Sequence, residues 1–142
     1  MIKKYLSSGN FNRIPAETYA TFIHEMFEKE GRKISGEAVD FILEWTFCHT
    51  YYTQFLCNRV FQLTREEATM TEVFQAIDDI LKENTDLFLE RRNLLTRKQW
   101  DSLIAVAKEK EVGQPTSATF LRKSGSSFRV YNVFFSRWLE RL

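Results

Sequence analysis

Apolar residues recur every three or four positions along most of the chain, which is the spacing of one face of an α-helix. Four such stripes occupy the first half and predict four helices joined by short turns, as in a helical bundle. The stripes consist of Tyr19, Phe22, Ile23, Met26 and Phe27; then Ala38, Phe41, Ile42 and Trp45; then Tyr52, Phe55, Leu56, Val60 and Leu63; then Val73, Ala76, Ile77, Ile80 and Leu81.

Helix-boundary residues lie where these stripes begin and end. Pro15 fits the start of the first helix and Gly31 its end. Ser35 fits the N-cap of the second helix. Thr64–Glu67 and Thr69–Glu72 both fit a capping box, and we prefer the second because the fourth stripe begins directly after it.

The second half has a weaker pattern. Residues 87–92 either continue the fourth helix or bend away from it, and Thr96 with Gln99 opens another helix that ends before Gly113. We expect a short helix from residue 116 or 117 through Leu121, a flexible joint at residues 123–127 and a strand at 128–131. The last stripe, which predicts a C-terminal helix, consists of Phe135, Trp138, Leu139 and Leu142.

These elements predict a mainly α fold with a minimal β element. We divide the chain into a lead-in (residues 1–13), a helical bundle (14–86) and a smaller subdomain (87–142). The chain has 142 residues, only 5 Gly and 2 Pro, and a net charge of +1. Positive charge is concentrated in residues 116–142, which contain five basic residues and one acidic residue. We expect a cytoplasmic protein without a membrane span, and two free, buried cysteines.

Motifs for self-contained catalysis are missing from the sequence. It has no P-loop, Cys-x-x-Cys pair, His-Glu-x-x-His or Gly-x-Ser-x-Gly motif, and its two histidines cannot complete a metal site alone. The adjacent carboxylates Glu66–Glu67 and Asp78–Asp79 point in different directions on a helix, which is typical of solvated faces. We therefore expect no enzyme activity from this chain, and no metal or other cofactor.

Three segments, in this order, carry a family resemblance: His49–Gln54 (HTYYTQ), Leu95–Trp100 (LTRKQW) and Arg129–Leu139 (RVYNVFFSRWL). Together they resemble the C-terminal half of archaeal-type P-loop ATPases of the AAA+/STAND group, in the form common in Bacteroides-like gut bacteria. The resemblance implies that the four helices form a lid, which follows a nucleotide-binding core. It also implies that the remainder is a winged-helix domain.

In that family the turn at His49 lies near the nucleotide. The resemblance therefore implies that His49 and Gln54 contact ATP, but only when the chain is joined to a P-loop core. Two residues depart from the family pattern, because Cys48 stands where Gly is usual and Thr50 where Pro is frequent. The winged helix is shortened as well: about one helix and one strand are missing between Lys123 and the final strand.

We expect a non-catalytic regulatory or interaction module that serves an ATPase core or another protein. The alternative is a nucleic-acid-binding module whose contacts would be Arg122, Lys123, Arg129, Arg137 and Arg141. A truncated winged helix would leave C-terminal aromatic and apolar residues without local partners, which predicts a homodimer through this segment. The residues concerned are Phe128, Val130, Phe134, Phe135 and Trp138.

Overall fold

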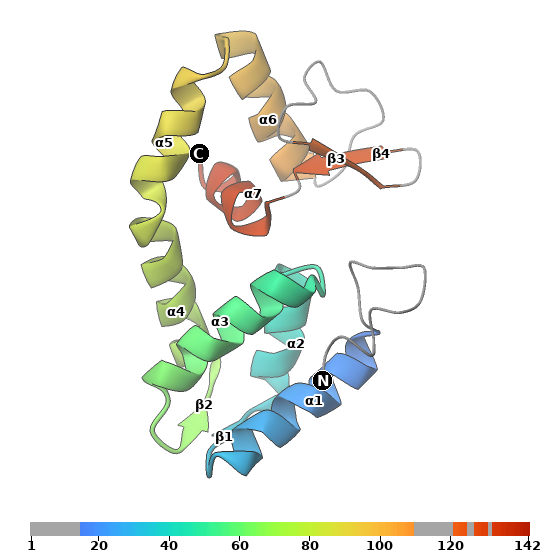
Figure 1. Cartoon of the computed structure of the whole chain (residues 1–142), viewed down its shortest axis with the longest axis vertical. Coiled ribbons are helices and arrows are strands. Elements are labelled where there is room, and N and C mark those ends of the chain that lie inside the picture. Colours follow the sequence, from blue (N-terminus) through green and yellow to red (C-terminus); the bar gives the residue numbers. More distant parts are fainter. Residues whose placement is uncertain (1–14, 110–120, 125–126, 131) are drawn as a thin grey trace. The chain divides into compact units, whose positions relative to one another are not determined.

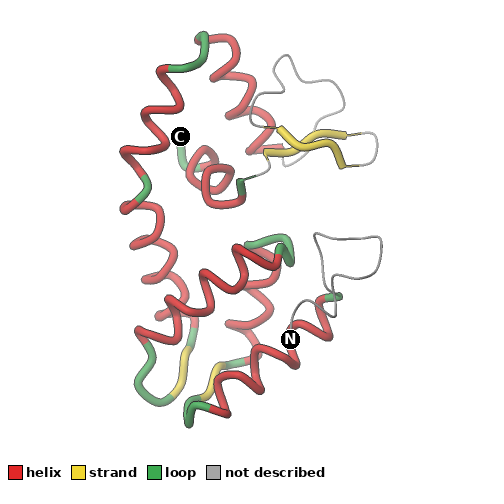
Figure 2. Tube along the Cα trace, viewed as in Figure 1, coloured by secondary structure: helices red, strands yellow, loops and turns green. Residues whose placement is uncertain are grey.

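The computed structural model describes residues 15–109, 121–124, 127–130 and 132–142, with side chains described outside 121–129. Seven helices and two small two-stranded sheets make up this part of the chain, which confirms the mainly α fold with a minimal β element (Figure 2). The chain forms two compact units that divide between Asp79 and Ile80, whereas the sequence places the boundary after residue 86. The predicted lead-in lies outside the described residues.

Unit 1, residues 15–79, is held together by helices and one short parallel strand pair (Figure 1). Its elements are α1 (Ala16–Lys29), β1 (Lys33–Ile34), α2 (Gly36–Trp45), α3 (Thr50–Leu63), β2 (Glu67–Ala68) and the first part of α4 (Met70–Glu83). In the strand pair, Lys33 lies opposite Glu67 and Ile34 opposite Ala68. The pair ties the α1–α2 connection to the α3–α4 connection.

The predicted helix boundaries of unit 1 are confirmed in atomic detail. Gly31 adopts φ +77° after α1, and its N–H and that of Arg32 donate to the Glu28 and Phe27 carbonyls at 3.0 Å each. This left-handed ending satisfies two carbonyls of the last turn. The Ser35 hydroxyl accepts from the Ala38 N–H at 3.1 Å and caps α2.

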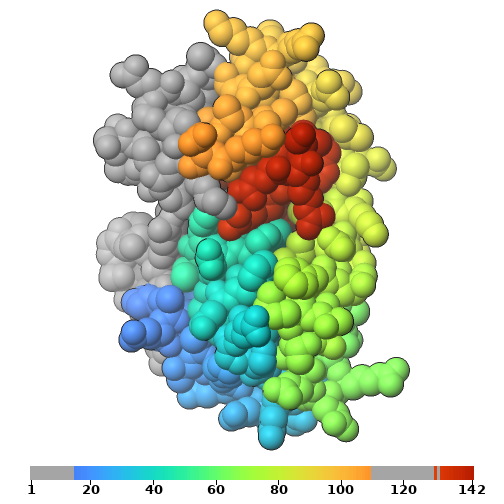
Figure 3. Space-filling view, turned by 180° about the vertical axis from the view of Figure 1, so that it is seen from behind, coloured from blue at the N-terminus to red at the C-terminus, as the bar shows by residue number. Residues whose placement is uncertain are grey.

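The start of α4 follows the preferred capping box. The Thr69 N–H and hydroxyl each donate to the Glu72 carboxylate at 2.8 Å. These hydrogen bonds lower the pKa of Glu72, because they stabilise its charged form. On the outer surface of unit 1, α2 and the first part of α4 lie side by side, where the Phe41 and Phe74 rings meet at 5.3 Å (Figure 3).

The buried face of α3 differs from the predicted stripe. Thr53, Leu56 and Val60 are buried, while Phe55 and Leu63 are 37% and 38% exposed. The stripe was wrong at these two positions because Thr53 takes the inward place, where its hydroxyl finds a buried partner. The apolar pattern of α3 therefore includes an outward aromatic residue that the core does not use.

Unit 2, residues 80–142, combines helices with a β-hairpin. It contains the last turn of α4, α5 (Thr85–Asn93), α6 (Arg97–Glu109), β3 (Leu121–Ser124), β4 (Ser127–Val130) and α7 (Val133–Glu140). The Asn84 side-chain amide donates to the Ile80 carbonyl at 2.8 Å and ends α4, so residues 85–93 form a separate helix. Thr96 and Gln99 bond reciprocally, at 2.9 and 3.2 Å, and confirm the box that opens α6.

The C-terminal hairpin corrects the predicted secondary structure. Leu121 begins strand β3 instead of ending a helix, and β3 pairs antiparallel with β4 so that Leu121 lies opposite Val130. Residues 123, 124 and 127, which were predicted to belong to a flexible joint, are strand residues, so the hairpin has two strands where the sequence predicts one. The rest of the predicted short helix, at residues 116–120, lies outside the described residues, as does the middle of the flexible joint at 125–126.

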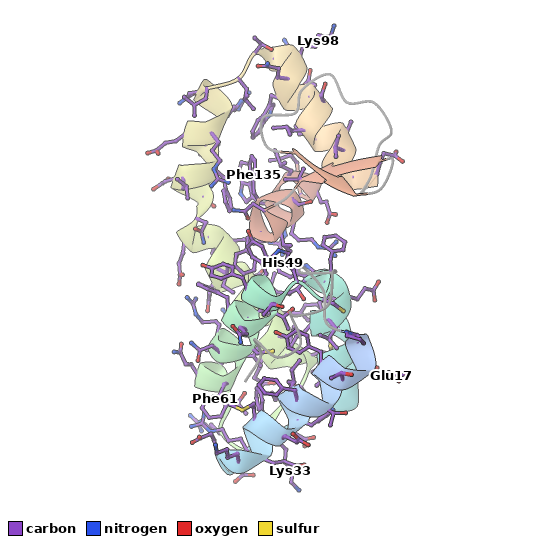
Figure 4. All side chains as sticks on the ribbon, turned by 45° about the vertical axis from the view of Figure 1, so that its right-hand side comes forward. Glu17, Lys33, His49, Phe61, Lys98 and Phe135 are labelled. Atoms are coloured by element: carbon purple, nitrogen blue, oxygen red, sulfur yellow. The ribbon has the colours of Figure 1, made fainter. Side chains whose placement is uncertain are left out.

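Four aromatic rings form the centre of unit 2. The Phe88 ring lies 5.2 Å from that of Phe135 and 5.4 Å from that of Trp138, and Trp100 approaches both at 6.2 and 6.1 Å. Figure 4 shows Phe135 directed between the helices of this unit. The expectation that Phe135 and Trp138 lack local partners was wrong, because Phe88 of α5 and Trp100 of α6 supply them. The side chain of Phe128 lies outside the described residues.

Candidate functional site

Two consecutive left-handed residues form the turn that precedes α3. Phe47 and Cys48 have φ values of 56° and 55°, although neither is glycine. Their N–H groups donate to the Glu44 and Leu43 carbonyls at 3.2 and 2.9 Å and so close the C-terminus of α2. Left-handed backbone costs a residue with a Cβ about 1–2 kcal/mol. The turn therefore holds a strained conformation directly before His49.

A buried pair of hydroxyl groups connects the two helices that meet at this turn. The Thr46 and Thr53 hydroxyl oxygens lie 2.7 Å apart, and the Thr46 hydroxyl also approaches the Ile42 carbonyl at 2.8 Å. Both threonines are fully buried. His49 is the N-cap residue of α3, and its ring lies edge-on to that of Tyr52 at 4.8 Å. The end of α2 and the start of α3 are thus joined by specific polar contacts.

Helices α1 and α3 run side by side in the same direction. At their N-terminal ends the Tyr19 hydroxyl donates to the Thr50 carbonyl at 3.2 Å. Near their C-terminal ends the Phe27 and Phe61 rings meet at 5.3 Å. Figure 4 shows His49 and Phe61 at opposite ends of α3. Large aromatic side chains therefore separate the two helices, and a groove runs along the surface between them.

This groove, the α1–α3 groove, has a volume of about 410 Å³. Phe22 and Met26 line it from α1, and Gln54, Cys57 and Asn58 from α3. Burial raises the pKa of the Cys57 thiol to about 12, so the thiol stays protonated at neutral pH. Volumes of 300–1,000 Å³ with mostly apolar walls and few polar groups are typical of binding sites.

The surface of α3 beside the groove carries no charged side chain among its exposed residues. These residues are Tyr51, Gln54, Phe55, Asn58, Gln62 and Leu63. Arg59 is the single charged residue in α3; it is half-buried, with its guanidinium 5.9 Å from the Phe55 ring. By contrast, three carboxylates, those of Glu17, Asp40 and Glu44, line a hollow of about 330 Å³ between α1 and α2. Three carboxylates therefore line the hollow on one flank of α1, whereas Glu30 is the single charged residue that lines the groove on the other.

The structure separates the two residues that the resemblance assigns to a nucleotide. His49 stands at the N-cap of α3, whereas Gln54 lines the α1–α3 groove. The groove contains Gln54 and the residues around it, and His49 is not part of its lining.

The predicted nucleic-acid contacts fall into two groups. Arg122, Lys123 and Arg129 lie on the β3–β4 hairpin, where Arg122 and Arg129 are register partners. Arg137 is 8% exposed, and its Nη1 donates to both carboxylate oxygens of Glu140 at 3.2 and 3.1 Å. The remaining cation, Arg141, is exposed at the end of α7. Arg137 is thus already paired within the chain.

Sequence reasoning selected Gln54 but missed the other side chains of the groove. Met26 and Phe22 were interpreted as core residues, and Asn58 was not singled out. A signal was present in α3, where six exposed positions carry aromatic, amide or aliphatic side chains and no charge.

Neither of two further features is found within the described residues. No group of three or more His, Cys, Asp or Glu side chains there is placed to hold a metal ion. None of the helices in the described ranges is long and apolar enough to cross a membrane. Comparison of the sequence with protein-family models, with curated proteins and with solved structures finds no match in any of the three.

Proposed function

We propose that the chain is a non-catalytic interaction module that docks a protein partner through unit 1. One observation carries this proposal: the exposed side of α3 is uncharged, aromatic and amide-bearing, and it continues into the α1–α3 groove. The centres of protein interfaces are depleted in charge and enriched in aromatic residues and Met. Tyr51, which is 59% exposed, and Phe55 and Met26, which are 37% and 39% exposed, have this character.

The resemblance to ATPase lids supplies the kind of partner. In such proteins a helical lid responds to the nucleotide state of a separate core, and docking to that core is how the response is transmitted. In this proposal the α3 surface and the groove make the protein contact. His49 and Gln54 reach ATP only in an assembly that contains a P-loop core.

Two measurements on the full chain test the proposal. The first is ATP hydrolysis by the purified chain, where turnover above background would overturn the non-catalytic assignment. The second is site-specific photocrosslinking in the cells that produce the chain, with the photoreactive residue at Tyr51 or, as the control, at Glu37, which is exposed on α2. We expect a discrete protein adduct from position 51 only. Equal adducts from both positions, or none from either, would contradict docking through α3.

A specific observation also favours the second candidate, nucleic-acid binding by unit 2. The register of the hairpin places Arg122 opposite Arg129, and Lys123 follows Arg122, so two short paired strands contain three basic residues. Contacts with phosphates would make binding fall steeply with salt. Fluorescence anisotropy with a labelled DNA duplex at low salt tests this candidate, and the absence of binding would dispose of it.

A further inference from the structure

The α1–α3 groove is elongated, and its polar groups are placed unevenly along it. It extends along α1 from Tyr19 to Glu30, a distance of about 16 Å along a helix. Gln54 and Asn58, one helical turn apart, place two exposed amides on the α3 side. Glu30 is the single charged residue among those that line the groove, and it lies at the C-terminal end of α1.

These features restrict the chemistry of an occupant. The apolar walls, which include Phe22, Met26 and Phe61, favour apolar side chains by removing them from water. A charged side chain seated against these walls would lose hydration without gaining a partner, which is costly. Side-chain amides both donate and accept hydrogen bonds, so the α3 side accepts neutral polar groups. Among the residues that line the groove, Glu30 is the one that would give a cation a countercharge.

We propose that this groove binds one amphipathic α-helix of a partner protein, an inference that rests on the interaction function proposed above. The partner helix presents apolar side chains at positions i, i+4 and i+7, uncharged polar residues beside them, and one Lys or Arg at the end that meets Glu30. Three anchors at this spacing cover about 10 Å of helix, which fits within the 16 Å of the groove.

A helix suits the site better than a small apolar molecule for two reasons. The groove is open along its length, with Met26 39% exposed and the amides of Gln54 and Asn58 at the surface. The uncharged surface also continues past the groove to Tyr51 and Phe55, which a small molecule would leave in water. A partner helix would cover both the groove and this adjoining surface.

The two internal methionines supply a local reporter for this binding. Met26 lines the groove, whereas Met70 is half-buried at the start of α4 and is not part of the groove. In the full chain labelled with ¹³C at the methionine methyl groups, a bound helix should shift the Met26 signal and leave that of Met70 in place. The probe is a display library of helical peptides with Leu or Phe fixed at i, i+4 and i+7 and all residues allowed elsewhere.

Matched variants then separate the groove and the α3 surface from the rest of unit 1. Asn58→Glu places a carboxylate in the groove, and Gln75→Glu makes the same type of change at an exposed position of α4, outside both the groove and α3. We expect selected peptides to bind the Asn58→Glu chain at least about tenfold more weakly and the Gln75→Glu chain within about twofold of wild type. Glu30→Gln should weaken peptides with a basic end by about threefold, the effect of an exposed ion pair. Thermal unfolding of each variant checks that the fold is kept.

Each outcome of the peptide-binding experiments either supports or overturns the inference. Selected peptides that are uncharged beside their anchors, basic at one end and sensitive to Asn58→Glu support the inference. It is overturned if no peptide is enriched on wild type over Asn58→Glu, or if peptides shift Met70 and not Met26. It is also overturned if indole or other small aromatic molecules shift Met26 while no peptide does. These results leave the ATP hydrolysis and crosslinking tests untouched, so the inference can fail while the proposed function stands.

Discussion

The backbone strain at Cys48 can be measured by comparing alanine and glycine at the two cysteines of the chain. Cys48 has φ 55° in the turn before α3, whereas Cys57 lies inside α3. Both cysteines are half-buried, and neither forms a disulfide. Replacing each cysteine by Ala and by Gly removes the thiol in every variant. The Ala-to-Gly difference at each position then reports the backbone conformation alone.

The Ala-to-Gly difference in stability should have opposite signs at positions 48 and 57. At position 48 the left-handed conformation costs Ala about 1–2 kcal/mol, and the greater freedom of Gly in the unfolded chain offsets about 0.5–1 kcal/mol of this. Cys48→Gly should therefore be more stable than Cys48→Ala by about 0.5–1 kcal/mol. At position 57 the helix favours Ala over Gly by about 1 kcal/mol. The Ala-to-Gly differences at the two positions should therefore lie about 2 kcal/mol apart.

Urea unfolding followed by circular dichroism measures all four variants with the same probe. Each 1 kcal/mol corresponds to about 3 °C in the unfolding temperature of a domain of this size, so thermal scans provide a second reading. If Cys48→Ala proves as stable as Cys48→Gly, or more stable, the left-handed turn does not exist in solution. A Gly preference at position 57 would instead show that α3 is interrupted there.

Three further predictions concern local features of unit 1. Gly31→Ala should destabilise the chain by about 1 kcal/mol, because Gly31 has φ +77°. Gly36→Ala should instead stabilise the chain by about 0.5 kcal/mol, because Gly36 lies in α2 with open space around it. Urea unfolding measures both changes. Thr53→Val should cost about 1 kcal/mol in the same assay by leaving the buried Thr46 hydroxyl without one of its partners, and the double Thr46→Val, Thr53→Val change should cost less than twice as much. Burial raises the pKa of the Cys57 thiol from 9.0 to about 12, so folding favours the neutral thiol. The contribution of this thiol to the free energy of unfolding should be complete below pH 9 and lost progressively as the pH rises to 12. Cys57→Ala should therefore flatten this part of a stability–pH curve.

Features specified by neighbouring residues were predicted from the sequence. The caps at Ser35, Thr69 and Thr96, and the left-handed ending at Gly31, each depend on hydrogen bonds within three to five residues. Their residue types favour the observed geometry without help from the rest of the fold. The existence of the helices and most of their limits followed from the same local signals.

Features that join distant segments were not predicted. The β1–β2 pair brings Lys33 beside Glu67, and two-residue strands have no periodicity of their own to reveal them. Strand β3 was missed because Leu121 follows residues that suit a helix start and residues 123–127 suit a flexible joint, whereas pairing with β4 gives Leu121–Ser124 an extended conformation. The inward place of Thr53 depends on a hydroxyl seven residues away, which an apolar pattern does not contain.

The candidate site was also only partly predictable, because it combines residues that are close in the sequence with residues from distant segments. Its two walls come from separate segments, around Met26 in α1 and around Asn58 in α3, and no local pattern indicates that they face each other. What the sequence does contain is a helix with one charged residue, Arg59, among its fourteen. That scarcity of charge is the signal, because ordinary surface helices carry charges on their exposed face. The outward position of Phe55 is known only from the structure.

The turn and the groove are connected through α3, and the predictions above can show whether this connection is functional. The Phe47–Cys48 turn determines where α3 begins, and Thr50, at that start, accepts the hydrogen bond from Tyr19 that holds α1 beside it. Cys48→Gly permits the same turn without strain but also permits other turns. If peptide binding at the groove is unchanged in this variant, the strained turn serves only the fold. If binding weakens while stability rises, the residues with side chains at this turn hold the two walls at the separation that a partner helix needs, and the strain is retained for binding.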